Sequence, residues 1–361
     1  MTPKKIAIVG GGINGLCAAW EMAKQGQQVT LYERGEIMQQ TSRSSSKMLH
    51  GGLRYLENYE FRLVKESLHE RKWWLNQAPH LVTPLQIFIP IYKHSRRPSW
   101  MMQLGLMLYD FLAGEHKLGS YQRYSAEQFT SLNPQIEPTE LSGGFSYFDA
   151  QMDDYALGCW AAEQAQLAGV IIKTHSEVAA VTKQGEVQLV SGGAENYDQV
   201  FNIAGPWAAK LLRQSNIQPT HSLDAVRGSH ILFNEPVENG YFLEVPDERR
   251  IFFVLPYKGQ TMVGTTEQRQ ALEEPIEASE EEIGYLLAAY NHHFKHDKSR
   301  ADIVSQFAGV RPLIRSSTDP NKISREYEID EQGQLVTVFG GKWTTSRALA
   351  KRLCEVAKAA H

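Results

Sequence analysis

The amino-acid sequence predicts an α/β chain with two domains, in which a mostly antiparallel β-sheet domain is inserted into a discontinuous α/β domain. At the N-terminus, a short apolar strand (Lys5–Val9), a glycine turn, an apolar helix (Leu16–Lys24) and a second strand (Val29–Tyr32) form one β-α-β unit. At the C-terminus, a strand over Leu335–Phe339 precedes another glycine turn and a helix. The segment 229–265 between them has strand-type runs. These observations predict a Rossmann-type domain interrupted by a sheet domain.

Length and composition narrow the class of protein. The chain has 361 residues, about the length of two domains, and its 42% apolar and 22% charged residues are typical of a globular protein. The 37 basic and 41 acidic residues give a net charge of −4, which argues against nucleic-acid binding. No apolar run reaches the roughly 20 residues that span a bilayer, and no signal peptide is visible. We therefore expect a cytoplasmic protein, with the inner face of the membrane as an alternative location.

Other helices are indicated by periodicity and by capping residues. Apolar residues in 59–78 recur near the 3.6-residue period of a helix, and 154–168 is a further helix candidate. Ser279 and Glu282 form a capping box, which predicts a helix running to about Phe294. The three cysteines, Cys17, Cys159 and Cys354, lie too far apart to predict disulfides or a zinc site.

The first glycine turn has the spacing of a dinucleotide-binding fingerprint. Gly10 permits the tight turn, Gly12 allows the backbone to approach a pyrophosphate, and Gly15 allows the helix to pack closely on the strand. The N-terminus of the helix then presents its N–H groups to the phosphates. Glu33 ends the second strand, where an acidic side chain binds ribose hydroxyls and disfavours NADP, although Arg34 follows it. Together these features predict a dinucleotide site.

Three further segments favour FAD over NAD. The hydroxyl-rich segment 41–47, which by itself reads more readily as a flexible polar loop, follows the ribose acid closely enough to wrap a second phosphate. Two more glycine turns follow apolar strands, at Ile203–Pro206 and at Phe339–Lys342. Contacts from the beginning, middle and end of the chain suit the long FAD molecule better than NAD.

Several segments together resemble the FAD-dependent glycerol-3-phosphate dehydrogenases, collinearly over nearly the whole chain. They are GGGING (10–15), TSRSSSKMLHGGLRYLE (41–57), YEFRLV (59–64), APHL (78–81), GSH (228–230), GVRPL (309–313) and FGGKWTT (339–345). The resemblance implies an amino-acid-oxidase-like fold and non-covalent FAD. It also implies oxidation of sn-glycerol 3-phosphate to dihydroxyacetone phosphate, with electrons passing to quinone or another acceptor. Many family members continue into a further helical domain, whereas this chain stops soon after the helix that follows Gly341.

The resemblance also implies domain limits and site residues. It places the FAD-binding domain at 1–78, 145–220 and 300–361, and the substrate domain at 79–144 and 221–299. The implied cofactor-binding residues are Gly10, Gly12, Asn14, Gly15, Glu33, Arg34, Thr41, Ser42, Ser45, Ser46, Lys47, His50, Gly51, Gly52, Leu53, Val178, Ala204, Gly205, Trp207, Gly309, Arg311, Gly340, Gly341, Lys342, Trp343 and Thr344. The implied substrate-binding residues are Arg54, Tyr55, His230, Arg311, Arg325 and Lys342.

Binding a phosphate dianion requires fixed cations, and arginine is well suited because its planar guanidinium gives bidentate hydrogen bonds. Arg54, Arg311, Arg325 and Lys342 lie in or near the matched motifs. Any single arginine is more often an ion-paired surface residue. The apolar neighbours of Arg311 argue against a solvated position, whereas Arg325 could simply pair with an adjacent glutamate.

Oxidation of an alcohol requires a base for the hydroxyl proton, and histidine is the natural base near neutral pH. His50 and His230 are the two candidates, and either could only orient other groups; we favour His230 as a substrate contact and leave His50 open as the base. The catalytic set is therefore His50, Arg54, His230, Arg311 and Lys342. His292, His293 and His296 include an i, i+4 pair, which by itself is weak evidence for a metal site, so we expect no metal.

Two alternatives to this function remain open. The same fold supports oxidases and dehydrogenases of amino acids or 2-hydroxy acids, which need one arginine for a carboxylate, whereas a phosphate usually draws two or more cations. A flavin-binding module without turnover is the other alternative. The apolar segment 99–113 is interpreted as a core helix, with contact at a membrane interface or a quinone path as the alternative, since 15 residues do not span a bilayer.

Overall fold

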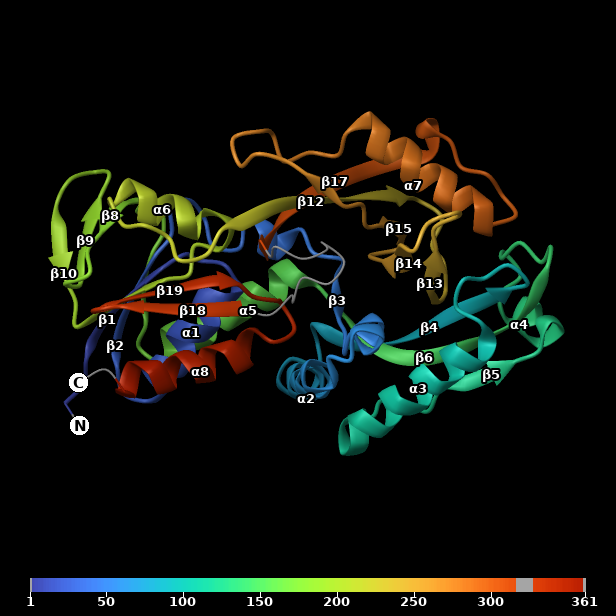
Figure 1. The fold of residues 1–361 in the computed structure, drawn as a ribbon, viewed down its shortest axis with the longest axis horizontal. Helices are drawn as coiled ribbons and strands as arrows, with labels where there is room; N and C mark the ends of the chain where they lie inside the picture. The colour runs from blue at the N-terminus through green and yellow to red at the C-terminus, as the bar shows by residue number, and fades with distance from the viewer. Residues whose placement is uncertain (1, 316–326, 360–361) are drawn as a thin grey trace.

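The computed structural model describes residues 2–315 and 327–359, and within them the chain forms two large β-sheets with helices packed on their faces (Figure 1). The first sheet has six strands. In spatial order these are β18 (Tyr327–Gln332), β19 (Leu335–Gly340), β11 (Gln199–Asn202), β1 (Lys5–Val9), β2 (Gln28–Tyr32) and β7 (Ile171–Lys173). All neighbours are parallel except β18 and β19, which form an antiparallel pair.

Side chains alternate between the two faces of this sheet, as the pleat of a strand requires. On strand β1, Ile6 and Ile8 point into a core made with the helices of one face, whereas Ala7 and Val9 point into a second core on the other face. The helices in the first core are α1 (Ile13–Lys24), α2 (Phe61–Gln77), α5 (Asp154–Leu167) and α8 (Ser346–Ala359). The second core holds α6 (Ala208–Gln214) and the small sheet β8 (Val178–Val181), β9 (Glu186–Leu189) and β10 (Ala194–Asn196).

The second sheet is larger and mostly antiparallel. Its strands, in spatial order, are β16 (Gln268–Arg269), β12 (Leu223–Phe233), β15 (Gln260–Gly264), β14 (Ile251–Tyr257), β13 (Gly240–Glu244), β4 (Val82–Tyr92), β6 (Leu141–Met152) and β3 (Met48–Leu49). Two more strands pair beside this path, β17 (Ile303–Ile314) with β12 and β5 (Gln122–Tyr124) with β6. Figure 1 shows β12 and β17 running side by side from the first sheet towards the outer helix of the second.

Helices cover both faces of the second sheet, again by alternation along the strands. Ile231 and Phe233 of β12 pack in a core with α7 (Glu280–His293), whereas Leu232 between them packs in the core that contains α3 (Ser99–Ala113). The short helix α4 (Ala126–Leu132) closes the far end and contributes Phe129 to the α7 core.

The predicted fold class is confirmed, and several predicted elements match closely. The helix predicted over 59–78 spans 61–77, and the capping box of Ser279 and Glu282 is present at the start of α7. The prediction of a core helix at 99–113 is correct for one face only. Met102, Leu106, Tyr109 and Ala113 are buried, but Trp100, Leu104, Met107 and Phe111 are exposed on the opposite face.

Candidate active site

A cavity of about 470 Å³ lies where the carboxyl ends of the first-sheet strands face the second sheet. Its wall begins with the residues that follow β1, β2, β11 and β19, namely Gly10, Glu33, Ala204 and Gly341. The chain leaves β1 and β11 on opposite sides of the sheet, so these two strands form a topological switch point, where α/β sheets bind ligands. From there the cavity extends to His230 and neighbouring residues of the second sheet.

The glycines of the first turn bring helix α1 close to the end of β1. Gly10 has a φ of +119°, which favours glycine, and a Cβ on Gly15 would lie 2.0 Å from the Gly10 carbonyl oxygen. Gly12 faces the segment that follows β2, where a Cβ would lie 3.0 Å from the hydroxyl oxygen of Ser42. The turn therefore permits only glycine at Gly15 without movement of the backbone.

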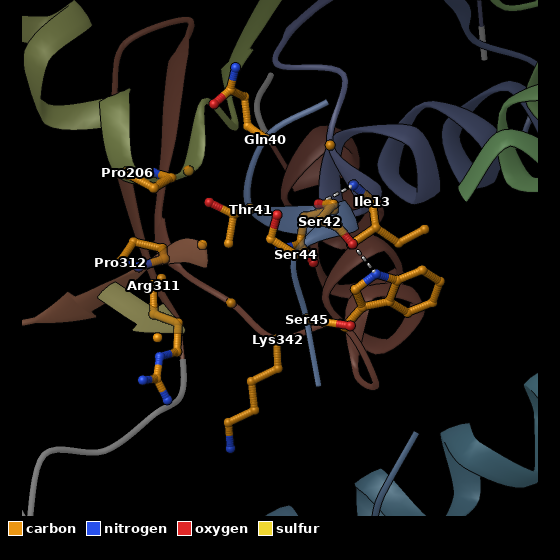
Figure 2. Close-up of a pocket in the computed structure, with 18 of the residues that line it drawn as sticks. Ile13, Gln40, Thr41, Ser42, Ser44, Ser45, Pro206, Arg311, Pro312 and Lys342 are labelled. Carbon is orange, nitrogen blue, oxygen red and sulfur yellow. Dashed lines mark hydrogen bonds between the residues drawn. The ribbon is translucent and has the colours of Figure 1, made fainter. Parts of the chain in front are cut away.

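Ser42 connects this turn to the C-terminal glycine turn. Its hydroxyl accepts the N–H of Ile13 at 3.1 Å, at the N-terminus of α1, and its carbonyl accepts the indole N–H of Trp343 at 2.9 Å (Figure 2). Thr41 extends the contact to the second sheet, since its hydroxyl donates to the carbonyl of Val310 at 2.6 Å. Residues from the beginning and end of the chain thus form one continuous wall of the cavity.

Glu33 and Arg34 form another part of the wall, after strand β2. One carboxylate oxygen of Glu33 accepts the N–H of Gly11 at 2.7 Å, and the other accepts the N–H of Gly35 at 3.1 Å. The carboxylate is thereby fixed at the cavity, with lone pairs left for a ligand hydroxyl. The guanidinium of Arg34 stacks over the ring of Trp207 at 4.2 Å, and both side chains line the cavity.

Two predicted cofactor residues after Ser42 lie behind the wall rather than in it. The ammonium of Lys47 is buried and donates to both carboxylate oxygens of Asp154 at 2.8 and 2.9 Å, and Ser45 also donates to Asp154 at 2.7 Å. The N–H of Gly51 donates to the hydroxyl of Tyr109 at 2.8 Å. Gly15, Lys47 and Gly51 are the predicted cofactor residues that do not line the cavity. All the other predicted cofactor residues line it.

A buried network behind Gly51 was not identified from the sequence. Asp149 accepts a hydrogen bond from Arg71 at 2.7 Å and another from Tyr109 at 2.7 Å, and Gly51 lies within 3.1 Å of the same carboxylate. These side chains come from α2, α3 and β6, so the backbone at Gly51 is fixed by three separate elements. The sequence gives no local signal for this network, since Arg71 lies between Glu70 and Lys72 and resembles a surface residue.

Cations from separate elements gather at the opposite end of the cavity. Figure 2 shows the side chains of Arg311, from β17, and Lys342, from the turn after β19, pointing to the same side. Arg311 donates to the carbonyl of Thr266 at 2.7 Å and lies 3.6 Å from the carboxylate of Glu267. Arg54 lines the same cavity. Arg325, the fourth predicted cation, lies outside the described residues.

Among these cations, Lys342 gives the clearest indication of an anionic ligand. Its ammonium nitrogen is buried, lies 4.0 Å from the centre of the Tyr55 ring, and has no hydrogen-bond partner among the described residues. A buried ammonium without a partner is costly, so an anionic ligand at this position would stabilise the site.

The two candidate bases differ in their surroundings. His230 is fully buried, stacks on Phe307 with ring centres 4.7 Å apart, and lies 3.0 Å from the hydroxyl of Ser46. Burial, aided by the charges of Lys47 and Arg311, lowers the pKa of His230 to about 3. His230 is therefore neutral at physiological pH. His50, by contrast, is half-buried, lines the cavity, and has its ring centre 6.2 Å from that of Tyr55.

The end of the cavity that holds the cations also has polar residues that the sequence analysis did not identify. Arg250, Thr265 and Glu267 line the cavity, and the guanidinium of Arg250 donates to the carbonyl of Thr265 at 3.3 Å. Arg250 precedes β14 and Glu267 follows β15, so only the antiparallel pairing of these strands brings them together.

The residues present fit the FAD expected from the sequence. The glycine turn leaves room for a pyrophosphate. The amide oxygen of Asn14 is buried and has no hydrogen-bond partner among the described residues, as expected for a side chain whose partner is a bound ligand. The cavity wall includes residues from 9–55, 203–214 and 340–344, so the beginning, middle and end of the chain all offer contacts to a dinucleotide.

Comparisons with known proteins agree with this geometry. A family model described as FAD dependent oxidoreductase matches residues 5–356. The chain is 39% identical to a glycerol-3-phosphate dehydrogenase of Pseudomonas aeruginosa, with 96% of this chain and 70% of that protein covered. It is 36% identical to a D-erythritol 1-phosphate dehydrogenase of Brucella abortus, with 96% and 72% covered.

Among solved structures, the glycerol-3-phosphate dehydrogenase of Bacillus halodurans complexed with FAD superposes with a TM-score of 0.79 at 23% identity, over 99% of this chain and 65% of that one. This similarity shows the fold. The chain thus spans about two thirds to three quarters of the length of these relatives. The family and the cofactor predicted from the sequence are confirmed: the chain belongs to the FAD dependent oxidoreductase family, together with the glycerol-3-phosphate dehydrogenases it resembles.

Proposed function

We propose that this enzyme oxidises sn-glycerol 3-phosphate to dihydroxyacetone phosphate, using non-covalently bound FAD. The observation that carries the proposal is the buried ammonium of Lys342, which points to the same side of the cavity as Arg311. Two fixed cations suit a phosphate dianion, since each charged hydrogen bond contributes roughly 1.5–3 kcal/mol. The names of the relatives from Pseudomonas aeruginosa and Brucella abortus support an alcohol that carries a phosphate.

In this proposal the cations hold the phosphate and the histidines act at the hydroxyl. Arg54, Arg311 and Lys342 bind the phosphate, and Tyr55 packs against the ammonium of Lys342. Bound FAD supplies a hydride acceptor, the flavin N5. Because the pKa of His230 is lowered to about 3, its imidazole is a weak proton acceptor and is better suited to orient the hydroxyl. We therefore assign the base to His50.

The cofactor contacts proposed here follow the cavity wall. The glycine turn and the N-terminus of α1 hold the pyrophosphate, Glu33 binds ribose hydroxyls, and Arg34 with Trp207 flanks the adenine end. The second glycine turn, with Thr344, faces the flavin end. Lys47 and Gly51 act indirectly, by supporting the segments that form the wall.

Two other substrate classes deserve a direct comparison. The Brucella abortus relative acts, by its name, on a polyol phosphate one carbon longer, so a longer phosphorylated polyol is the second candidate. Amino acids and 2-hydroxy acids carry a carboxylate, which one arginine satisfies, and a second buried cation would then have no counter-ion. The cation pair therefore favours phosphate over carboxylate.

The proposal is tested by anaerobic reduction of the purified holoprotein. Glycerol 3-phosphate is expected to bleach the oxidised flavin absorbance, while unphosphorylated glycerol and lactate leave it unchanged. Erythritol phosphate in the same series measures the tolerance for chain length. If the phosphorylated alcohols leave the flavin oxidised although dithionite reduces it, the proposed function is wrong.

We also propose peripheral contact with a membrane, where a quinone would accept the electrons. Four apolar side chains of α3, spaced by four, three and four residues, form one exposed stripe; Trp100 is 68%, Leu104 59%, Met107 51% and Phe111 80% exposed. Tyr59, just before α2, is also exposed, at 79%. A patch of this kind marks an interaction surface, and an amphipathic helix can lie in a bilayer interface. Among the described residues no helix has both the length and the apolar character needed to cross a bilayer.

The test of this contact is flotation of the holoprotein with phospholipid vesicles. The paired substitutions Leu104→Ser and Phe111→Ser are expected to reduce the vesicle-bound fraction severalfold, while turnover with a water-soluble acceptor stays unchanged. Leu132→Ser, at an exposed apolar residue of α4, serves as the matched control. Equal flotation of the wild type and the paired variant would show that α3 does not contact the membrane.

A further inference from the structure

Five of the seven tryptophans form one connected cluster that begins at the cofactor cavity. Trp343 lines the cavity, and its ring centre lies 5.4 Å from that of Trp74 on α2. Trp74 in turn lies 5.0 Å from Trp73 and 6.3 Å from Trp160 of α5, and both of these rings lie near Trp20 of α1, at 5.9 and 5.6 Å. The proposed alcohol oxidation uses none of the rings beyond Trp343.

We propose that Trp343, Trp74 and Trp160 form an electron relay between the bound flavin and the surface of α5, which makes the protein capable of light-driven flavin reduction. This activity needs bound FAD but no alcohol substrate. Trp74 is fully buried between the other two, and Trp160 is half-buried on α5, so an external electron donor can reach the outer end of the relay.

Hydrogen bonding within the relay favours movement of an electron over loss of a proton. An oxidised indole becomes a strong N–H acid, and it is trapped once a nearby base takes the proton. The indole nitrogen of Trp74 has no hydrogen-bond partner among the described residues, and that of Trp343 donates to a backbone carbonyl, which is a very weak base. The positive charge on either ring is therefore free to pass outward.

Fixed charges select the outer end of the relay. The guanidinium of Arg347 lies 4.2 Å from the centre of the Trp73 ring, and the ammonium of Lys24 lies 5.3 Å from that of Trp20. A cation over a ring makes loss of an electron from that ring less favourable, and the carboxylates paired with these two cations, Glu70 with Arg347 and Glu21 with Lys24, reduce this effect. Within the described part of the chain, no lysine or arginine lies over Trp160 in this way. Trp160 is therefore the ring from which the electron enters.

The electrons balance in single steps. Trp343 gives one electron to the light-excited flavin, Trp74 gives one to oxidised Trp343, and Trp160 gives one to oxidised Trp74. A thiol in solution then gives one electron to Trp160 and releases one proton to the buffer. A second photon repeats the sequence. The two thiyl radicals combine to one disulfide, and the flavin reduced by two electrons takes up two protons from the buffer, which balances the two that the thiols release.

The test uses the holoprotein under anaerobic conditions, with dithiothreitol and blue light and without substrate, and follows the oxidised flavin absorbance. The wild type is expected to bleach, Trp74→Phe to bleach severalfold more slowly, and Trp160→Phe to be slowed as well, while Trp73→Phe behaves as wild type. Trp343→Phe is expected to raise the flavin fluorescence severalfold, because the first electron donor is lost. Trp73 lies in the same cluster, next to Trp74, with the guanidinium of Arg347 over its ring, and serves as the matched control.

Several outcomes would overturn the relay. Bleaching of Trp74→Phe at the wild-type rate would do so, and so would a loss of bleaching in Trp207→Phe alone, which would assign the electron to the tryptophan at the other end of the cavity. Trp160→Phe alters a half-buried side chain and keeps the test valid if the Trp74 variant does not fold. A wild-type flavin that resists light but is bleached in the dark by glycerol 3-phosphate would refute the relay and leave the proposed function intact.

Discussion

The two ends of the cavity are built in different ways. At the nucleotide end, Gly10, Gly12, Gly15 and Glu33 lie within 24 consecutive residues, and the site follows from local backbone geometry. At the cation end, Arg54, His230, Arg311 and Lys342 come from four segments spread over most of the chain, and only the pairing of β12 with β15 and β17 brings the histidine and the arginine to one place. The nucleotide end depends on the absence of side chains at its glycines, whereas the cation end depends on the charges of its side chains.

The largest effect is expected at the nucleotide end, from Gly15→Val. A Cβ at this position would lie 2.0 Å from the Gly10 carbonyl oxygen, so α1 must move away from the end of β1. Such overpacking costs about 1–3 kcal/mol or more, and here it also displaces the N–H groups that face the pyrophosphate. The purified variant is expected to be colourless, and flavin absorbance per protein measures this.

Gly35→Ala is the matched control for that variant. A Cβ at Gly35 would meet nothing within 4 Å, and this variant is expected to retain FAD as the wild type does. Retention of a full complement of FAD by Gly15→Val would show that the nucleotide end tolerates side chains, and the proposed contrast between the two ends would fail.

A smaller effect, confined to the substrate, is expected at the cation end. Lys342→Ala removes one charged hydrogen bond to the phosphate, which corresponds to a loss of about 1.5–3 kcal/mol, or roughly 10- to 100-fold in kcat/KM. Steady-state kinetics with glycerol 3-phosphate measure this loss, and flavin absorbance is expected to change much less. Arg300→Ala, which removes an exposed arginine paired with Glu280, is the control with unchanged kinetics.

Equal losses of FAD and of substrate turnover in Lys342→Ala would contradict the division into two ends. Lys342 would then hold the cofactor. Arg311→Ala provides the second measurement, because Arg311 comes from β17 rather than from the glycine turn after β19.

The glycine turn of the nucleotide end could be predicted from local spacing, whereas the residues of the cation end were predicted only through resemblance. The spacing of Gly10, Gly12 and Gly15 defines a turn by itself, so no distant contact is needed to predict it. The apolar neighbours of Arg311 argue only against a solvated position, and its place at the substrate was predicted only because the GVRPL motif matched a known family.

Strands β4 and β6 and the residues they support were not predicted. Pro84 and Pro90 interrupt β4, and Gly143 and Gly144 interrupt β6, so both segments lack the uninterrupted β-branched pattern that indicates a strand. Their pairing over nearly their whole length is a long-range contact, invisible to local patterns. Asp149, and with it the network that fixes Gly51, was missed for this reason.

The smallest predicted effect concerns pH, because His230 at the wall of the cation end has a strongly lowered pKa. The pKa of His230 is lowered to about 3 by burial and by the charges of Lys47 and Arg311, whereas an unfolded histidine has a pKa of about 6.5. Between these values the unfolded chain binds the additional proton, so the free energy of unfolding falls as the pH is lowered below 6.5. At pH 5.5 the loss is about 1.4 kcal/mol for this residue.

Denaturant unfolding at pH 7.5 and pH 5.5 measures this loss, and His230→Gln is expected to be about 1.4 kcal/mol less sensitive to the change than the wild type. The remaining sensitivity includes His293, whose pKa burial lowers to about 4, at a distance from the cavity. His293→Gln is therefore the comparison that separates the two histidines, since it changes stability in acid without touching the cavity. If His230→Gln keeps the full acid sensitivity, His230 is protonated in the folded enzyme, and the assignment of the base to His50 loses its support.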